Sequence, residues 1–159
     1  MQNFLFNKIA SGVYMLGTCD GNKRNACVID SCMHVTFQPA RVAISVLKTN
    51  LTTEMIQKSG VFSLSVFDRS VQIETIARFG FQSGRNADKF GGFECPSDSN
   101  GCPYLKEQVC GMLSAKVISA IDMGTHLLFV GEVQNAEVFS NRAPELFTEY
   151  QRELNSQPN

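Results

Sequence analysis

Residues 12–47 have the sequence GVYMLGTCDGNKRNACVIDSCMHVTFQPARVAISVL, and the patterning of this stretch decides the fold. Apolar and polar side chains alternate in residues 12–19, 34–37 and 41–47, with the β-branched residues that are typical of strands. Asp20-Gly21 supplies the residues that a tight hairpin turn needs before residues 23–30 return antiparallel. The stretch therefore predicts four successive strands.

The rest of the chain continues this pattern with further strands and short helices. Strands are predicted at residues 61–67, 109–121 and 127–138. Helices are predicted at residues 54–58 (ended by Gly60 in the left-handed conformation), 71–79 (capped by Asp68 or Ser70 and ended by Gly80) and from Pro144 to about Leu154. Residues 81–103 show no sustained period and predict a long irregular excursion.

Composition places the chain among ordinary soluble domains. Its 159 residues, 43% of them apolar, predict one domain over residues 1–159. A formal net charge of -1 gives no overall attraction to nucleic acid or to anionic membranes. No stretch approaches the roughly 20 apolar residues of a membrane span, so we expect a cytoplasmic protein.

The six cysteines are expected to be free thiols, because a core of this size needs no disulfides and the cytosol is reducing. Cys95, Cys102 and Cys110 stand seven and eight positions apart without a Cys-x-x-Cys pair. This spacing does not fit a zinc site, and no metal is predicted.

Two loops combine cations, hydroxyl groups and backbone amides. They are residues 48–53, which lead into a helix, and residues 83–89. Unpaired amides at the helix start, the hydroxyl of Thr52 and the guanidinium of Arg85 are suited together to bind a phosphate group. The alternative is that Thr52 only caps its helix while Arg85 and Lys89 are solvated charges.

Four motifs, in order and across nearly the whole chain, resemble the flavin reductase-like FMN-binding split-barrel family, which includes flavoredoxins and the flavin domain of high-molecular-weight rubredoxins. The motifs are DSCMHVTFQP (30–39), KTNLTTE (48–54), FGFQSGRNADKF (79–90) and GTHLLFVGEV (124–133). The resemblance implies a mainly β, Greek-key split barrel of about six strands with short flanking α-helices, and FMN as the cofactor.

The resemblance also implies site residues. Ser31, Cys32 and Met33 would lie along the flavin ring, with Asp30 beside it. Lys48, Asn50, Leu51 and Thr52 would meet the ribityl chain and phosphate. Ser83, Gly84, Arg85 and Lys89 would close over that phosphate. A lone histidine in an apolar strand is commonly structural, whereas the family pattern places His126 near the flavin as a nicotinamide-binding or catalytic residue.

The function implied is that of an oxidoreductase, which accepts hydride from NAD(P)H and passes electrons to free flavin, a ferric complex or a small redox protein. A homodimer that walls two FMN sites is implied as well. One alternative is an FMN electron carrier reduced by a partner protein. Another, a barrel that binds nucleic acid, is disfavoured by the near-neutral charge.

Overall fold

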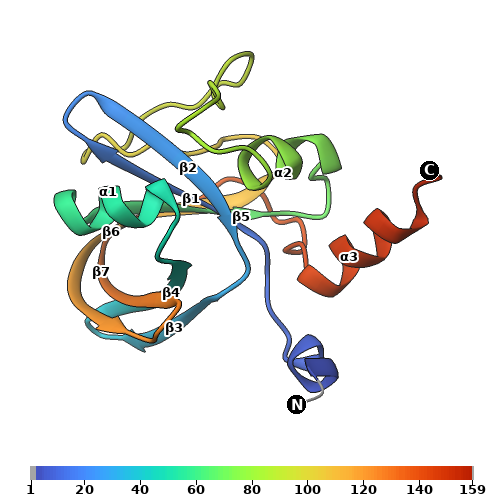
Figure 1. Cartoon of the computed structure of the whole chain (residues 1–159), viewed down its shortest axis with the longest axis horizontal. Helices are drawn as coiled ribbons and strands as arrows, with labels where there is room; N and C mark the ends of the chain where they lie inside the picture. The colour runs from blue at the N-terminus through green and yellow to red at the C-terminus, as the bar shows by residue number, and fades with distance from the viewer. Residues whose placement is uncertain (1–2, 159) are drawn as a thin grey trace.

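The computed structural model describes residues 3–158, and Figure 1 shows a curled antiparallel sheet with helices around it. Within these residues seven strands pair in the order β2-β1-β5-β6-β7-β4-β3. The strands are β1 (Tyr14–Asp20), β2 (Lys23–Ile29), β3 (Cys32–Phe37), β4 (Ala40–Leu47), β5 (Val61–Phe67), β6 (Val109–Asp122) and β7 (His126–Val138). The helices are the 3-10 helix η1 (Asn3–Lys8) and the α-helices α1 (Leu51–Ser59), α2 (Ile73–Gly80) and α3 (Phe147–Ser156). The predicted mainly β split barrel is confirmed, with seven strands where about six were expected.

The first four predicted strands form in sequence, but the first turn differs from the prediction. Asp20 is still paired with Lys23, so the turn falls at residues 21–22 instead of at Asp20-Gly21. Gly21 begins the turn with a φ of 59°, which a residue without a Cβ adopts at little cost.

The longest strands, β6 and β7, bend the sheet. Their pairing runs from Gly111 and Val138 to Asp122 and Leu127 and shifts register twice. Such β-bulges bend a strand and increase its twist. The β6–β7 ribbon thereby curls beneath α1 together with β3 and β4, as Figure 1 shows.

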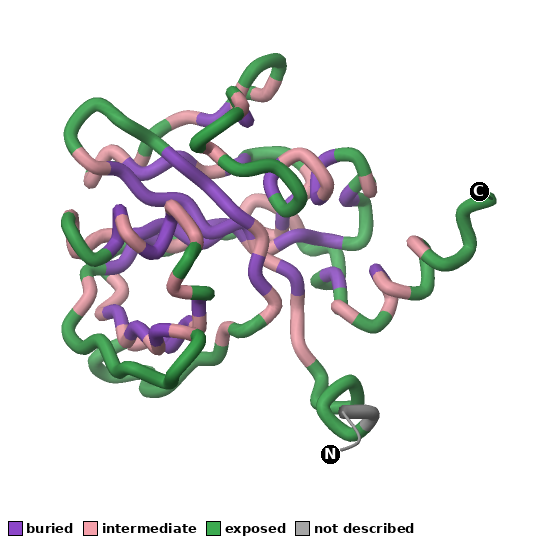
Figure 2. Tube along the Cα trace, in the orientation of Figure 1, coloured by how far each residue is buried: buried purple, intermediate pink, exposed green. Residues whose placement is uncertain are grey.

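Alternation along β4 separates the core from the opposite face of the sheet. Val42, Ile44 and Val46 are buried in the core cluster that includes Phe62 and Phe129. The alternate residues, at 43, 45 and 47, point to the other face because side chains alternate along a strand. Figure 2 shows buried backbone along β1, β2 and β5, with exposed segments at both ends of the described chain.

The first predicted helix forms and begins three residues earlier than expected. Asn50 is its N-cap, and its side chain accepts a hydrogen bond of 2.9 Å from the amide of Thr52. Gly60 ends the helix with a φ of 72° and donates to the carbonyl of Ile56, as predicted.

Two other predicted helix starts are wrong. Neither Asp68 nor Ser70 caps α2, because Asp68 Oδ1 instead accepts bonds from the amide and hydroxyl of Ser70 in a turn that precedes the helix. Pro144 does not open α3, since it pairs with Asp68 in an isolated antiparallel bridge and the helix begins at Phe147.

The irregular excursion predicted over residues 81–103 forms and extends to residue 108, and its far end is attached to the barrel. The hydroxyl of Ser63 donates to the carbonyl of Pro103 at 2.6 Å, and that of Ser65 accepts from the amide of Leu105 at 3.0 Å. Gly17 is needed beneath this contact, since a Cβ there would overlap the Pro103 carbonyl. Among the described residues, no helix has the length and apolar character to cross a membrane.

Candidate functional site

Two hollows lie along the face of β4 that points away from the core. The first, here called the strand hollow, has a volume of about 490 Å³. Its wall contains the predicted residues Asp30, Ser31, Cys32 and Met33, together with Ala43, Ser45, Leu128 and parts of residues 6–11. The second, the helix hollow, has a volume of about 260 Å³ and lies between the start of α1 and residues 79–83.

β4 joins the two hollows. Ser45 lines the strand hollow and Leu47 lines the helix hollow. These residues are two positions apart on one face of the strand, roughly 7 Å along it. The face of β4 that carries Ser45 and Leu47 therefore forms a path from one hollow to the other.

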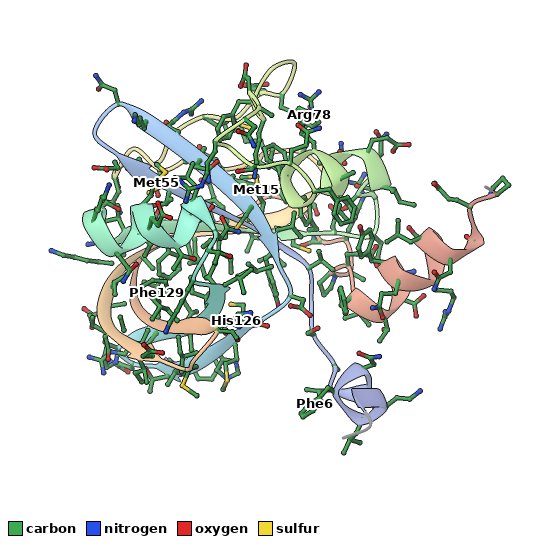
Figure 3. All side chains as sticks on the ribbon, viewed as in Figure 1. Phe6, Met15, Met55, Arg78, His126 and Phe129 are labelled. Carbon is green, nitrogen blue, oxygen red and sulfur yellow. The ribbon has the colours of Figure 1, made fainter. Side chains whose placement is uncertain are left out.

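His126 lies beside this path. It pairs with Leu47, and Leu128 pairs with Ser45, so these side chains share one face of the sheet. The half-buried imidazole has its Nδ1 2.8 Å from the hydroxyl oxygen of Thr125. Figure 3 shows His126 in the curled part of the sheet.

The start of α1 offers backbone donors to the helix hollow. Asn50 provides the acceptors for three of the first-turn amides, those of Thr52, Thr53 and Glu54. Among the described residues no acceptor is assigned to the amide of Leu51, which lines the hollow with Thr49 and Asn50. A helix start with a free amide favours an anionic ligand.

Asn25 brings the two predicted loops together. Its buried side chain donates a hydrogen bond of 2.8 Å to the hydroxyl oxygen of Thr52. On its other side, a Cβ at position 84 would overlap Asn25 Oδ1, so only glycine fits there. Thr52 and the loop of Gly84 and Arg85 therefore lie on the same side of the molecule.

Lys89 is a buried cation in the lining of the helix hollow. Its side chain is 4% exposed overall, and Nζ donates to the carbonyls of Ala26 at 2.7 Å and Phe79 at 3.0 Å. Burial lowers the pKa of this ammonium, an effect that the neighbouring Cys27 thiol opposes. In the part of the chain that the structure describes, no carboxylate forms an ion pair with Lys89.

Lys48 and Arg85, the other two predicted cations, are each paired with a carboxylate. Lys48 Nζ lies 2.5 Å from Oδ1 of Asp122, the last residue of β6. Arg85 forms an ion pair with Glu54 on α1, and both side chains are partly exposed. Neither cation lines the helix hollow.

Thr52 also differs from its predicted role as a phosphate donor. It is fully buried, and its hydroxyl lies between Asn25 and Cys27. Burial raises the pKa of Cys27, so this thiol is protonated at neutral pH. The exposed hydroxyl of Thr49 lines the hollow in its place.

The predicted ring-binding segment is held by backbone contacts. The carbonyl of Ser31 accepts from the amide of Ser45 at 3.1 Å, and the Ser31 hydroxyl lies 3.1 Å from Asp30 Oδ1. Burial raises the pKa of Cys32 to about 11, so its thiol is neutral as well. The half-buried carboxylate of Asp30 is therefore the charged group of this wall.

Several residues of the site were missed by sequence reasoning. They are Asn25, Cys27, Ser45, Thr49, Gln82 and Leu128. Two of them carried a usable signal: Ser45 precedes Leu47 by two positions on an alternating strand, and Leu128 follows His126 by two. Asn25 and Cys27 carried none, because their neighbours are distant in sequence.

The known family of flavin reductase like domains matches this chain over residues 6–156. The chain is 33% identical to the high molecular weight rubredoxin of Moorella thermoacetica over 94% of its own length, and it spans 66% of that protein, just under two thirds. It is 30% identical to the ferric-chelate reductase (NAD(P)H) of Archaeoglobus fulgidus over 91% of its length and 86% of that protein.

Comparison with solved structures supports the same fold. The NADH:FAD oxidoreductase of Streptomyces globisporus C-1027 superposes with a TM-score of 0.82 at 21% identity. The match covers 90% of this chain and 84% of that one. At this level of identity the similarity establishes the architecture alone.

The two threonines of the α1 loop give a first prediction. Thr52→Val leaves the buried Asn25 amide without its acceptor, so we expect a loss of about 1–3 kcal/mol in the free energy of unfolding. Thr49→Val, at an exposed position, serves as the control and should change that free energy by less than about 0.5 kcal/mol. Urea unfolding measures both, and equal losses would contradict the buried bond.

Proposed function

Since the chain belongs to the family of flavin reductase-like domains, we propose that it binds FMN and works as an NAD(P)H-dependent oxidoreductase. The flavin ring lies in the strand hollow, and the ribityl phosphate lies in the helix hollow. The residues proposed to contact it are those that line the two hollows: Asp30, Ser31, Cys32, Met33, Asn50, Leu51, Ser83 and Lys89. The other predicted residues, Lys48, Thr52, Gly84 and Arg85, are proposed to hold the two loops around the phosphate.

The observation that carries this proposal is the buried Lys89 ammonium without a paired carboxylate. A buried charge is costly unless an opposite charge and hydrogen bonds compensate it. Two carbonyls satisfy two of its three N–H groups, and Lys89 lines a hollow that also receives the α1 start. A phosphate in this hollow completes the hydrogen bonding and supplies the missing negative charge.

FMN fits this arrangement better than FAD does. The terminal phosphate of FMN carries nearly two negative charges, and a buried ammonium with a helix start favours such a concentrated charge. FAD places a diester chain at the same position, and its adenosine half needs a further surface. The NADH:FAD oxidoreductase among the structural neighbours makes FAD the competing cofactor to test.

A flavin held there would supply hydride acceptance from NAD(P)H and transfer of one or two electrons. The chain itself would bind and orient the reactants. Backbone groups of residues 31–33 would hold the ring edge, and His126, which pairs with Leu47, would position a nicotinamide amide. The Asp30 carboxylate would place a negative charge near the ring, which would lower the reduction potential of the flavin.

For the electron acceptor we propose free flavin, a ferric complex or a small redox protein. Two relatives have names that include a ferric chelate and rubredoxin, the ferric-chelate reductase and the high molecular weight rubredoxin. These names describe those proteins, and they make ferric chelates and rubredoxin the first acceptors to assay.

The phosphate assignment predicts a selective effect of Lys89→Met. FMN affinity should fall by about 10- to 100-fold because a charge-assisted bond is lost, whereas riboflavin affinity should change less than about threefold. Fluorescence titration of the purified protein measures both. Arg85→Met, which breaks the exposed pair with Glu54, is the matched control and should have a smaller effect. Equal loss of FMN and riboflavin affinity would contradict the assignment.

The same residue makes FMN binding depend on pH. Burial holds the pKa of Lys89 below the ordinary lysine value of 10.5. Between that lowered pKa and 10.5, Lys89 is protonated in the unfolded chain but deprotonated in the folded, FMN-free protein. Lys89 thus makes the FMN-free protein more stable as pH rises through this window. FMN needs the protonated form, so its affinity should fall as pH rises there, and Lys89→Met should remove that slope.

The N-terminal segment favours a second candidate, an FMN electron carrier reduced by a partner protein. Phe6 and Ile9 line the strand hollow while remaining largely exposed, and Figure 3 shows Phe6 on the N-terminal helix. Side chains in this position restrict the space over a bound ring. A nicotinamide must displace them to stack there.

Stopped-flow reduction of the FMN-loaded protein separates the two candidates. An NAD(P)H-dependent reductase should lose its flavin absorbance within seconds of mixing with NADH or NADPH. His126→Ala should then slow this reduction by about tenfold without a change in FMN affinity. If neither nucleotide reduces the flavin while a chemical reductant does, the protein is a carrier.

We further propose a homodimer. Met33, Leu47 and Ile121 are 63%, 44% and 45% exposed, and their strand partners are Ala43, His126 and Leu128. They therefore share the face of the sheet that carries the two hollows. A contiguous apolar face of this kind marks an interaction surface, and a second copy covers it by twofold symmetry.

Sedimentation tests the homodimer directly. The protein should sediment at twice the chain mass, and Ile121→Glu should convert it to the monomer and weaken FMN binding as well. Ile118→Glu serves as the control, because Ile118 is similarly exposed (48%) but lines neither hollow. Monomeric wild-type protein with full FMN affinity would rule out an interface that walls the site.

The proposal also includes one domain over residues 1–159 and a cytoplasmic location. Residues 1, 2 and 159 lie outside the described part of the chain. Limited proteolysis and cell fractionation test these two points.

A further inference from the structure

Two cysteines outside the candidate site lie next to each other although they are 83 positions apart. Cys19 is near the end of β1, and Cys102 belongs to the end of the long excursion. Their Sγ atoms are 3.7 Å apart, and both side chains are buried. Among the described residues no other two thiols come within hydrogen-bonding distance.

The segment that carries Cys102 is held firmly against the barrel. Asp98 Oδ1 accepts from the amides of Asn100 at 2.9 Å and Cys102 at 2.8 Å, and Asp98 Oδ2 accepts from the hydroxyl of Ser114 on β6 at 2.6 Å. The Sγ of Cys19 lies 3.0 Å from the carbonyl of Asn100. The backbone therefore presents the two sulfurs to each other in the reduced protein.

We propose that Cys19 and Cys102 are a redox pair, which a peroxide converts to an intramolecular disulfide between β1 and the excursion. This inference does not depend on flavin binding. The sulfurs need to approach from 3.7 Å to about 2.05 Å, a movement within reach of side-chain rotation.

The two cysteines differ in exposure, and this difference indicates which one the peroxide oxidises first. Cys19 is 7% exposed and Cys102 is 0% exposed, so a small oxidant such as hydrogen peroxide reaches Cys19 first. Burial, followed by the nearby Asp98 carboxylate and Cys19, raises the pKa of Cys102. Cys102 thus remains a thiol until the neighbouring sulfur is activated.

The chemistry proceeds in two balanced steps. Cys19 loses its proton to water and its thiolate attacks one peroxide oxygen; the O–O bond breaks, hydroxide leaves, and a sulfenic acid forms. The Cys102 sulfur then attacks the Cys19 sulfur; the S–O bond breaks, and the departing hydroxide takes the Cys102 proton. In total two thiols give up two electrons, and one peroxide is reduced to two molecules of water.

Oxidation followed by mapping of the product tests the proposal. Reduced protein is treated with about 1 mM hydrogen peroxide, alkylated and digested. Free thiols should fall from six to four per chain, and mass spectrometry should find the Cys19 and Cys102 peptides linked. The melting temperature should rise by about 10 °C because the crosslink closes a long loop, and dithiothreitol should reverse the rise.

Variants separate this pair from the other thiols. Cys102→Ser should abolish the thermal gain and leave a Cys19 sulfenic acid that dimedone traps, whereas Cys110→Ser should keep the full gain. A linked peptide that joins other cysteines, or six thiols remaining in excess peroxide, would overturn the proposal. Because the peptide map is made on the wild-type protein, the result stands even where Cys102→Ser does not fold.

Discussion

The hydrogen bond between the Asn25 amide and the Thr52 hydroxyl is the constraint on which the site depends. It joins the β1–β2 hairpin to the first turn of α1, and Asn25 also leaves room only for glycine at position 84. One buried amide thereby sets the distance between two loops that lie more than thirty residues apart in the sequence. Without it, the partly exposed ion pair of Arg85 with Glu54 would be left to hold the helix start against the excursion, and surface pairs of this kind contribute little stability.

Electrostatics divides the three cations of these loops into two groups. Lys48 and Arg85 neutralise carboxylates at the rim, on Asp122 and Glu54, and surface pairs of this kind contribute little stability. Arg24 binds the excursion through the carbonyl of Cys95. Lys89 alone is both buried and unpaired with a carboxylate among the described residues, so the positive charge in the lining of this hollow comes from a residue that looks like an ordinary surface lysine in the sequence.

The sequence predicts the strands well because alternation and β-branched residues act locally, and Gly60 ends α1 as expected because a left-handed residue needs no distant partner. The errors arise where a residue that looks like a local helix cap or start instead makes its contacts elsewhere in the fold. Asp68 had the composition of a helix cap, but it is committed to Ser70 and to a bridge with Pro144. The partners of Lys89 and Lys48 could not be assigned from sequence either, since Ala26 and Asp122 lie 63 and 74 positions away.

The alternation along β4 has a consequence for how this sequence can vary in length. Its even-numbered residues from 42 to 46 fill the core, and its odd-numbered residues from 43 to 47 form the path between the hollows. Inserting or deleting a single residue would exchange the two sets, putting Val and Ile toward the hollows and Ser45 into the core. Natural relatives should therefore keep the length of this strand constant and accommodate insertions in the exposed tip of the excursion around Gly91 and Gly92, where backbone has room to lengthen.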